Sequence, residues 1–188
     1  MLYLGDVRVV DADLEPISAH MVRPMEPDYP HALMRNLAPG CTFVFNRAAR
    51  ELMLGYDADE LGIESHDWLA FQIVACFGRV VFDPVPHMDY RQHGDNSIGA
   101  AWGTLGELPA KVRSFWNGRM RNSRERNAQR LVCAFGERMS GINRSITADF
   151  AHYRGDPLSK KHLLGTWGRV FERREWSLIS LLARMGRL

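Results

Sequence analysis

The chain has 188 residues, of which 46% are hydrophobic, and its 24 Lys and Arg against 22 Asp and Glu give a formal net charge of +2. This length fits one compact domain or one and a half, and the apolar fraction is enough to form a core, which excludes global disorder. The small net charge gives no electrostatic reason to expect a nucleic acid partner.

Basic side chains concentrate in the C-terminal half of the chain. They recur from Lys111 onward, and this asymmetry indicates an anionic surface as a partner. The residues include Arg119, Arg121, Arg124, Arg126, Lys160, Lys161, Arg169, Arg173, Arg174, Arg184 and Arg187.

The cysteines and the N-terminus bear on localisation. Cys41, Cys76 and Cys133 are odd in number and far apart, which predicts neither a disulfide framework nor a zinc knuckle and fits a reducing compartment. The N-terminus has no basic leader followed by a long apolar run, and no segment reaches the roughly 18 to 20 apolar residues that span a bilayer. We therefore expect a cytoplasmic protein, soluble or peripheral on the inner face of the membrane.

The first 37 residues mix strand and loop signals. Aliphatic and β-branched residues predict a buried strand over 2–10, and the Asp-Ala-Asp sequence at 11–13 predicts a turn. Four prolines within 16–30 predict an irregular connection, and a short helix is expected over 31–37.

Strands and helices then alternate up to residue 86. A break at Pro39 and Gly40 precedes a predicted strand over 41–45, and Asn46 is suited to cap a helix through Leu54. Ser65 can cap the next helix, which is apolar nearly all round and ends at Gly78.

The next stretch returns to strand and loop. A strand is expected over 79–82, ended by the sequence Asp-Pro-Val-Pro at 83–86. A polar loop over 87–103 then carries the densest set of chemically capable side chains.

From Thr104 onward the periodicity is helical. Helices are predicted near 105–117, 122–140, 143–153, 160–171 and 175–186, with Gly141, Gly155 and Gly186 as ends. The fold class is therefore α/β and helix-rich, with an α/β part followed by a mainly helical C-terminal region.

Two stretches carry a family resemblance: LAPGCTFVFNR at 37–47 and HDWLAFQIVACFGRVVFDPVPHMDYRQHGDN at 66–96. In their residues and in their order along the chain they resemble the second half of family 2 glycosyltransferases, in particular the bacterial rhamnosyltransferase-like branch. The resemblance covers residues 1 to about 100 and accounts for the rest more loosely. It implies a partial GT-A, Rossmann-like fold over 1–100, followed by a helical region over 101–188.

The resemblance also implies an activity. Family members transfer a sugar with inversion from a nucleotide sugar, here one such as dTDP-rhamnose, to a saccharide or lipid-linked acceptor in cell-surface polysaccharide synthesis. The family uses an Asp-x-Asp metal motif, a glycine loop, an acidic motif that holds the catalytic base, and a late histidine near the metal and diphosphate. A divalent cation, Mg²⁺ or Mn²⁺, would neutralise the leaving diphosphate in the complete enzyme.

Gly40, Cys41 and Thr42 match the glycine loop as donor or acceptor-binding residues. A missing Cβ lets backbone amides approach a hydroxyl closely. Without its companions, a glycine after a proline and before a strand is an ordinary turn.

Asp67 matches the acidic motif, with His66 and Trp68 beside it. A carboxylate can take the proton from the acceptor hydroxyl during attack, and a first-turn helical position would hold it toward a cleft. The alternative is a helix cap, because an aspartate near a helix N-terminus is favoured by the macrodipole and by free amides. Trp68 could form a wall for sugar stacking, or it could belong to the core.

His93 matches the late histidine and is the predicted metal ligand, because an imidazole can bind a divalent cation. Arg91 suits a diphosphate, since its planar fork makes bidentate contacts, and Gln92 and Asn96 complete the predicted binding run. The alternative is a polar surface loop that contains a His and an Arg.

One departure from the family pattern limits the analogy. The family's Asp-x-Asp motif lies upstream of the equivalent of Leu2, and the sequence from Asp11 to Asp13 has the right letters in the wrong place, so we interpret it as turn chemistry. We therefore expect weak donor binding by this chain alone. We also expect self-association or a separate N-terminal half, because a cut GT-A sheet exposes an edge and apolar surface.

Two other functions stay open. A metal-dependent hydrolase would use a cluster of histidines and aspartates, and the His-x-Asp spacing at 87 and 89 suits a metal. Its residues would be His66, Asp67, His87, Asp89 and His93. A non-catalytic module would keep only an acceptor-binding or scaffold role.

The C-terminal helix over 175–186 has an apolar face edged by basic residues. Such a helix could lie on an anionic membrane, where lipid-linked acceptors reside, or it could dock on the rest of the protein.

Overall fold

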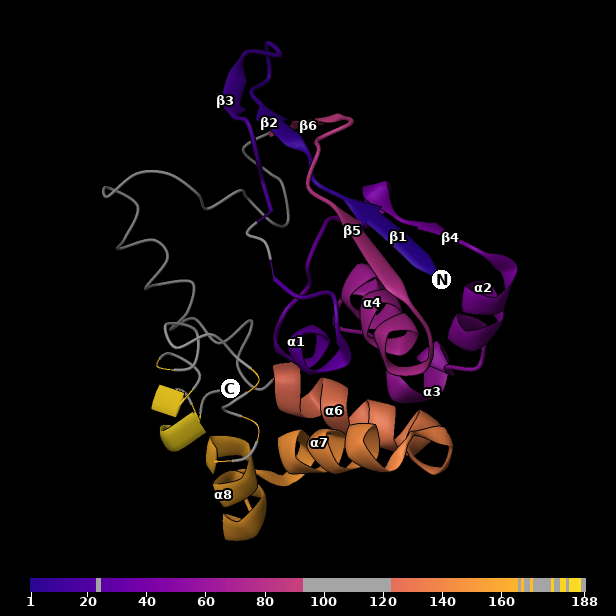
Figure 1. Cartoon of the computed structure of the whole chain (residues 1–188), viewed down its shortest axis with the longest axis vertical. Helices are drawn as coiled ribbons and strands as arrows, with labels where there is room; N and C mark the ends of the chain where they lie inside the picture. The colour runs from indigo at the N-terminus through magenta and orange to yellow at the C-terminus, as the bar shows by residue number, and fades with distance from the viewer. Residues whose placement is uncertain are drawn as a thin grey trace.

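A computed structural model describes residues 1–22, 25–92, 123–165, 167, 170, 177, 180, 181 and 183–186. The chain is a mixed α/β, helix-rich protein with two small three-stranded sheets and a mainly helical C-terminal region (Figure 1). Among the described residues, none of the helices combines the length and apolar character needed to cross a bilayer.

The first sheet has the order β4-β1-β5, with β1 (Leu2–Gly5) in the centre. β4 (Val44–Phe45) pairs with β1 antiparallel, and β5 (Val80–Asp83) pairs with it in parallel. Leu2 and Leu4 alternate with Tyr3 and are fully buried in a cluster with helix residues, so one face of β1 forms core.

The second sheet contains the strand that follows β1 in the chain. β2 (Arg8–Val10) pairs with β3 (Pro16–Ser18) antiparallel and with β6 (Asp89–Arg91) in parallel. The strand predicted over 2–10 is therefore two strands in different sheets. The prediction of a loop over 87–103 was wrong at 89–91, because the backbone there pairs with β2.

The buried Asp6 makes the bend between the two strands. One oxygen of its carboxylate accepts hydrogen bonds from the backbone amides of Val7, Met21 and Val22, at 2.7, 3.0 and 2.8 Å. These bonds satisfy the Val7 amide at the bend and hold the segment that follows β3 against it. The turn predicted at 11–13 is confirmed, since the Asp11 side chain accepts from the amide of Asp13 at 2.9 Å.

Side-chain caps start several helices of the α/β part. Ser65 precedes its helix as predicted, but its hydroxyl donates to Asp67 and makes no capping hydrogen bond. Asn46 caps its helix by accepting from the amide of Ala49 at 3.0 Å, as predicted. Asp28 caps the first helix, which therefore starts earlier than expected. The predicted strand over 41–45 is a one-turn 3₁₀ helix and then the short β4. The elements are α1 (Tyr29–Met34), η1 (Gly40–Thr42), α2 (Arg47–Leu54), α3 (Ala58–Leu61) and α4 (His66–Phe77).

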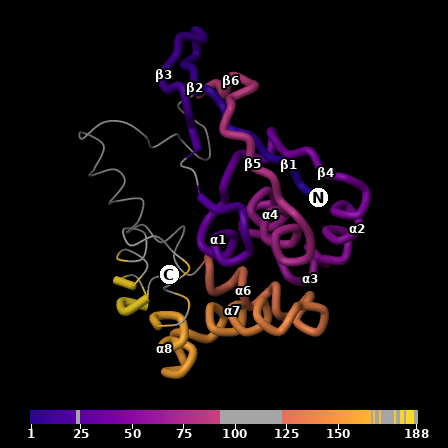
Figure 2. The backbone as a smooth tube through the Cα atoms, viewed as in Figure 1, coloured from indigo at the N-terminus to yellow at the C-terminus, as the bar shows by residue number. Residues whose placement is uncertain are grey.

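The C-terminal region is a layer of helices that lies against α1, α3 and α4 (Figure 2). Helices are present near 122–140 and 143–153 as predicted, but the first ends at Phe135 and is followed by a 3₁₀ helix. Gly141, predicted as a helix end, is instead the first residue of the second helix, because the Ser140 side chain caps it. The next helix starts at Pro157, because Asp156 accepts from the first-turn amides of Leu158 and Ser159. The predicted helix over 105–117 lies outside the described residues, and that over 175–186 is described only in part. The elements are α6 (Ser123–Phe135), η3 (Gly136–Arg138), α7 (Gly141–His152) and α8 (Pro157–Gly165).

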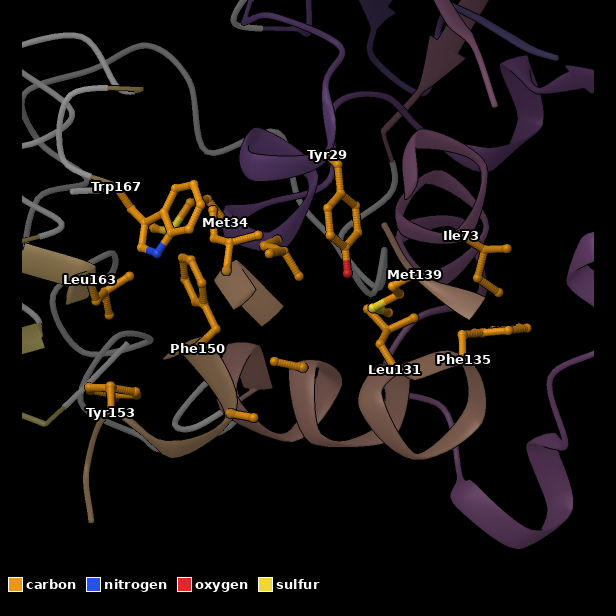
Figure 3. Packing of buried hydrophobic residues seen from close by; sticks show 14 of the residues in the cluster. Tyr29, Met34, Ile73, Leu131, Phe135, Met139, Phe150, Tyr153, Leu163 and Trp167 are labelled. Atoms are coloured by element: carbon orange, nitrogen blue, oxygen red, sulfur yellow. The ribbon is translucent and has the colours of Figure 1, made fainter. Parts of the chain in front are cut away.

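One apolar cluster joins the two regions (Figure 3). Tyr29 and Ile73 from α1 and α4 pack in the same cluster as Leu131, Phe135 and Phe150 from α6 and α7. Burial of each large apolar side chain contributes about 1.5–3 kcal/mol. The domain boundary predicted at residue 100 lies outside the described residues, and on either side of it the chain shares this cluster.

Candidate functional site

The glycine loop and the acidic motif meet at the carboxyl end of β1. η1 lies beside that end, where the amide of Gly5 donates to Thr42 Oγ1 at 3.2 Å. Thr42 Oγ1 in turn donates to the carbonyl of Pro39 at 2.8 Å, which closes the turn. In open α/β sheets, ligands bind outside the carboxyl ends of parallel strands, and β1 and β5 are such a pair.

Gly40 lies directly against Asp67. Its amide nitrogen is 3.3 Å from Asp67 Oδ2, and a Cβ added to Gly40 would be 2.9 Å from Asp67 Cβ, which is too close for two carbon atoms. The backbone of Gly40 is not in the left-handed region, so this position needs a glycine for space and not for its conformation. The two predicted elements are thus in contact, although 27 residues separate them in the sequence.

Asp67 is held at both carboxylate oxygens. Oδ1 accepts from Ser65 Oγ and from the amide of Trp68, the latter at 2.8 Å, and Oδ2 accepts from Gly40. Its 9% exposure makes it one of the few buried carboxylates in the described chain. The carboxylate therefore binds the amide of the next residue in the helix and also contacts the backbone of Gly40.

The neighbours of Asp67 differ in exposure. Trp68 is 4% exposed, and its indole N–H donates to the carbonyl of Ala32 at 2.6 Å. Trp68 therefore belongs to the core, because its side chain turns toward α1. The prediction that it binds a ligand is corrected. His66, at the first position of α4, is exposed, and its Nε2 is 3.3 Å from the position of a Cβ on Gly40.

Cys41 contributes a weakly polar group to the loop. Its thiol is 3.8 Å from Met88 Sδ, which connects η1 to the segment before β6. Partial burial, together with the nearby negative charge of Asp67, raises the pKa of the Cys41 thiol, so it stays protonated at neutral pH.

The structure describes only part of the run from Arg91 to Asn96 that was predicted to bind the diphosphate and the metal. Arg91 ends β6 with an exposed side chain, and the amide of Gln92 donates to the carbonyl of Val10 at 2.8 Å. His93 and Asn96 lie outside the described residues, so their predicted roles as metal ligand and binding residue stay predictions.

A hydrogen-bonded group that the sequence analysis missed surrounds Asp83 at the end of β5. Asp83 Oδ2 accepts from the Tyr3 hydroxyl at 2.6 Å and lies 3.0 Å from His87 Nε2, while Oδ1 accepts from the amide of Val85 at 2.9 Å. The hydrogen bond from Tyr3, then those from Val85 and His87, lower the pKa of Asp83 to about 2. The signal was available, because Tyr3 alternates with Leu2 and Leu4 and must face away from the core.

The described residues do not fit a metal centre. No group of three or more His, Cys, Asp or Glu side chains gathers among the residues that the structure describes. His87 binds Asp83, while Asp89 pairs with Arg8 at 2.6 Å, so the predicted His-x-Asp pair is divided between separate partners. The cluster proposed for a hydrolase is not assembled from the residues that the structure describes.

No family model, curated protein or solved structure matches this chain. The resemblance to family 2 glycosyltransferases therefore depends on the motifs at 37–47 and 66–96. The contact between Gly40 and Asp67 is the structural feature in which those two motifs meet.

Proposed function

We propose that this chain carries the acceptor side of an inverting glycosyltransferase site of the GT-A type. The supporting observation is the contact between Gly40 and Asp67 at the carboxyl end of β1. It joins the residues that match the family's glycine loop to those that match the acidic motif, which would hold the catalytic base. The donor would be a nucleotide sugar such as dTDP-rhamnose, and the acceptor a saccharide or lipid-linked saccharide.

In the proposed reaction, the oxygen of an acceptor hydroxyl attacks the anomeric carbon from the face opposite the leaving group. The bond from that carbon to the diphosphate oxygen breaks, and the diphosphate leaves with the electron pair, which inverts the configuration. Asp67 Oδ2 takes the hydroxyl proton. This oxygen accepts a single long hydrogen bond, from Gly40, and therefore keeps a lone pair for the incoming hydroxyl.

Other parts of the chain would assist donor binding. Arg91 would contact the diphosphate, because a guanidinium makes charge-assisted bidentate bonds to phosphate oxygens. The edge strand β4 exposes Val44 (65%) and Phe45 (45%), which supports pairing with a second copy or with a separate donor-binding half.

The test is a transfer assay on the full chain. Purified protein is incubated with dTDP-, UDP- and GDP-sugars, Mn²⁺ and a saccharide or lipid-linked acceptor, and both released nucleoside diphosphate and glycosylated product are measured. Replacing a catalytic base typically reduces the rate about 10²–10⁴-fold, so Asp67→Asn should remove most of the product.

Asp57→Asn is the matched control, because Asp57 also lies at a helix N-terminus but only caps α3. This variant should keep the wild-type rate. Equal rates for Asp67→Asn and wild type would contradict the assignment of the base. Acceptor binding without transfer from any donor would contradict transfer by this chain alone and support the non-catalytic module.

A further inference from the structure

Ser65 lies at the N-terminus of α4 but does not act as a side-chain cap. Its carbonyl accepts the first hydrogen bond of the helix, from the amide of Leu69 at 3.0 Å, so its backbone takes the capping position. A serine there usually accepts a further bond from a first-turn amide through its hydroxyl. The Ser65 hydroxyl makes no such bond and donates to Asp67 Oδ1 instead. This serine therefore gives up a bond that would stabilise the helix and engages the acidic motif.

Ser140, at the start of α7, shows the ordinary arrangement. Its hydroxyl oxygen accepts from the amide of Asn143 at 3.3 Å. Both serines have extended backbone, so the backbone conformation does not account for the difference. The residue two places further on does differ, because it is Asp67 in one helix and Ile142 in the other. A carboxylate is a strong acceptor and draws the hydroxyl away from the amides.

The bond from Ser65 fixes the orientation of the Asp67 carboxylate. The torsion that turns an aspartate carboxylate has a broad energy minimum, so hydrogen bonds decide its angle. Oδ1 accepts from Ser65 and from the amide of Trp68, the latter at 2.8 Å. Oδ2 accepts from Gly40 at 3.3 Å, which is longer than the usual range for such a bond. The two oxygens are thus unequal, and Oδ2 is the less engaged one.

Ser65 is the one side chain that donates to Asp67 within the part of the chain that the structure describes. The other two donors are the backbone amides of Trp68 and Gly40, which a substitution leaves in place. The Ser65 hydroxyl can therefore be removed by mutation while the remaining contacts of the carboxylate are kept.

We infer that Ser65 is a positioning residue for Asp67. It holds Oδ1, so that Oδ2 is the oxygen presented to the acceptor hydroxyl, and it does not itself touch the acceptor. This inference rests on the proposed function for the role of Asp67 as the base. A reacting group displaced by about 1 Å can lose a factor of about 10² in rate, so a bond that fixes the angle of the carboxylate bears directly on catalysis.

The first test measures kcat and KM in the transfer assay, with dTDP-rhamnose as donor and the saccharide acceptor that gives most product with wild type. Ser65→Ala should lower kcat by about 10- to 100-fold and leave the KM for the acceptor unchanged, because it disturbs the base and not acceptor binding. Ser65→Thr keeps a hydroxyl on the same carbon and should restore most of kcat.

Ser140→Ala is the matched control, because it removes a serine at the same place in another helix. It should lower the midpoint of urea unfolding and leave kcat unchanged. If Ser65 is only structural, Ser65→Ala will behave in the same way, and the inference is overturned. Circular dichroism confirms that each variant is folded.

A double mutant tests whether Ser65 acts through Asp67. In the Asp67→Asn protein, Ser65→Ala should cause little further loss of kcat, because the base that Ser65 orients is already gone. The same fold-loss in the Asp67→Asn protein as in wild type would overturn the inference.

A readout without substrate separates this inference from the proposed function. The carboxyl carbon of Asp67 is followed by NMR in the full chain, with its signal assigned from Asp67→Asn. Ser65→Ala should shift this signal, whereas Ser140→Ala should leave it in place. A shift in a wild-type chain that transfers no sugar would reject the transferase and keep Ser65 as the residue that orients Asp67. An unshifted signal would overturn the role of Ser65, even if wild type transfers sugar.

Discussion

The helical layer of α6, α7 and α8 and the carboxyl end of β1 differ in how their polar side chains are used. The layer contains a surface hollow of about 460 Å³, lined by Glu125, Gln129, Ala151, His152, Gly155, Asp156 and Ser159. Its two carboxylates are occupied, since Glu125 pairs with Arg154 at 3.0 Å and Asp156 caps α8. At the end of β1 the exposed His66 lies beside Gly40, and its imidazole makes no hydrogen bond within the part of the chain that the structure describes.

The comparison indicates that the shape of the surface alone is not enough to choose between two candidate sites. A polar group that already stabilises the fold has little left to offer a ligand, because breaking its internal bond costs roughly what the new bond gains. In the hollow of the helical layer, Glu125, Gln129, Asp156 and Ser159 are held by contacts within the layer, while the exposed His152 side chain makes no hydrogen bond within the described residues. The end of β1 combines held groups, Asp67 and Thr42, with a free one, His66.

The largest expected effect tests whether the helical layer is part of one folding unit. Phe150 is fully buried in the cluster that joins α7 to α1 and α4, so Phe150→Ala should lower the free energy of unfolding by about 3–5 kcal/mol. Urea unfolding is followed by circular dichroism and by tryptophan fluorescence, and both should give one shared transition.

Leu158→Ala serves as control, because Leu158 is 65% exposed on α8 and should change stability by less than about 0.5 kcal/mol. Two separate transitions in wild type, or a small effect of Phe150→Ala, would show that the layer folds independently of the α/β part.

The next effect concerns the site region. Gly40→Ala should destabilise the chain by about 1–3 kcal/mol, because the new Cβ would meet Asp67 Cβ at 2.9 Å and η1 must move. Gly141→Ala is the matched control, since a Cβ there meets nothing within 4 Å, and a helical alanine is favoured by up to about 1 kcal/mol. Chemical denaturation gives the free energy of unfolding of both variants. Similar values for Gly40→Ala and Gly141→Ala would mean that the loop at Gly40 accommodates the extra methyl group without strain.

A smaller effect is expected from a polar contact inside the helical layer. The indole N–H of Trp167 donates to the buried Asp149 Oδ2 at 2.6 Å. Trp167→Phe removes the donor and leaves the carboxylate short of one partner, at a cost of about 1–3 kcal/mol in stability. Asp149→Asn should lower the free energy of unfolding by less in the Trp167→Phe protein than in wild type, and a double-mutant cycle measures that difference. Additive effects would indicate that the bond contributes nothing.

The last prediction concerns pH at the end of β5. Because the folded protein lowers the pKa of Asp83 from 3.8 to about 2, its contribution to stability is present above pH 3.8 and is lost as the pH falls toward 2. Tyr3→Phe removes the main cause and should raise the pKa of Asp83 toward 3.8, measured by NMR titration of the carboxyl carbon. An unchanged pKa in Tyr3→Phe would assign the shift to Val85 and His87 instead.

The sequence alone determined the elements whose signals are local. Asn46 as a cap, the apolar helix that ends at Gly78, the strand before Asp83 and most of the described C-terminal helices follow from periodicity, caps and breakers within a few residues. The motif letters at 37–47 and 66–96 also identified Gly40, His66 and Asp67 as candidates before their positions in space were known.

Only the tertiary structure decided which of these candidates meet and which are free. The split of residues 2–10 into two sheets depends on pairing with β5 and β6, and the strand at 89–91 forms because β2 lies beside it. The placement of Trp68 in the core and the contact of Gly40 with Asp67 depend on partners 36 and 27 residues away. Long-range pairing and packing set these features, because a local pattern fixes which face of an element is apolar but not which element covers it.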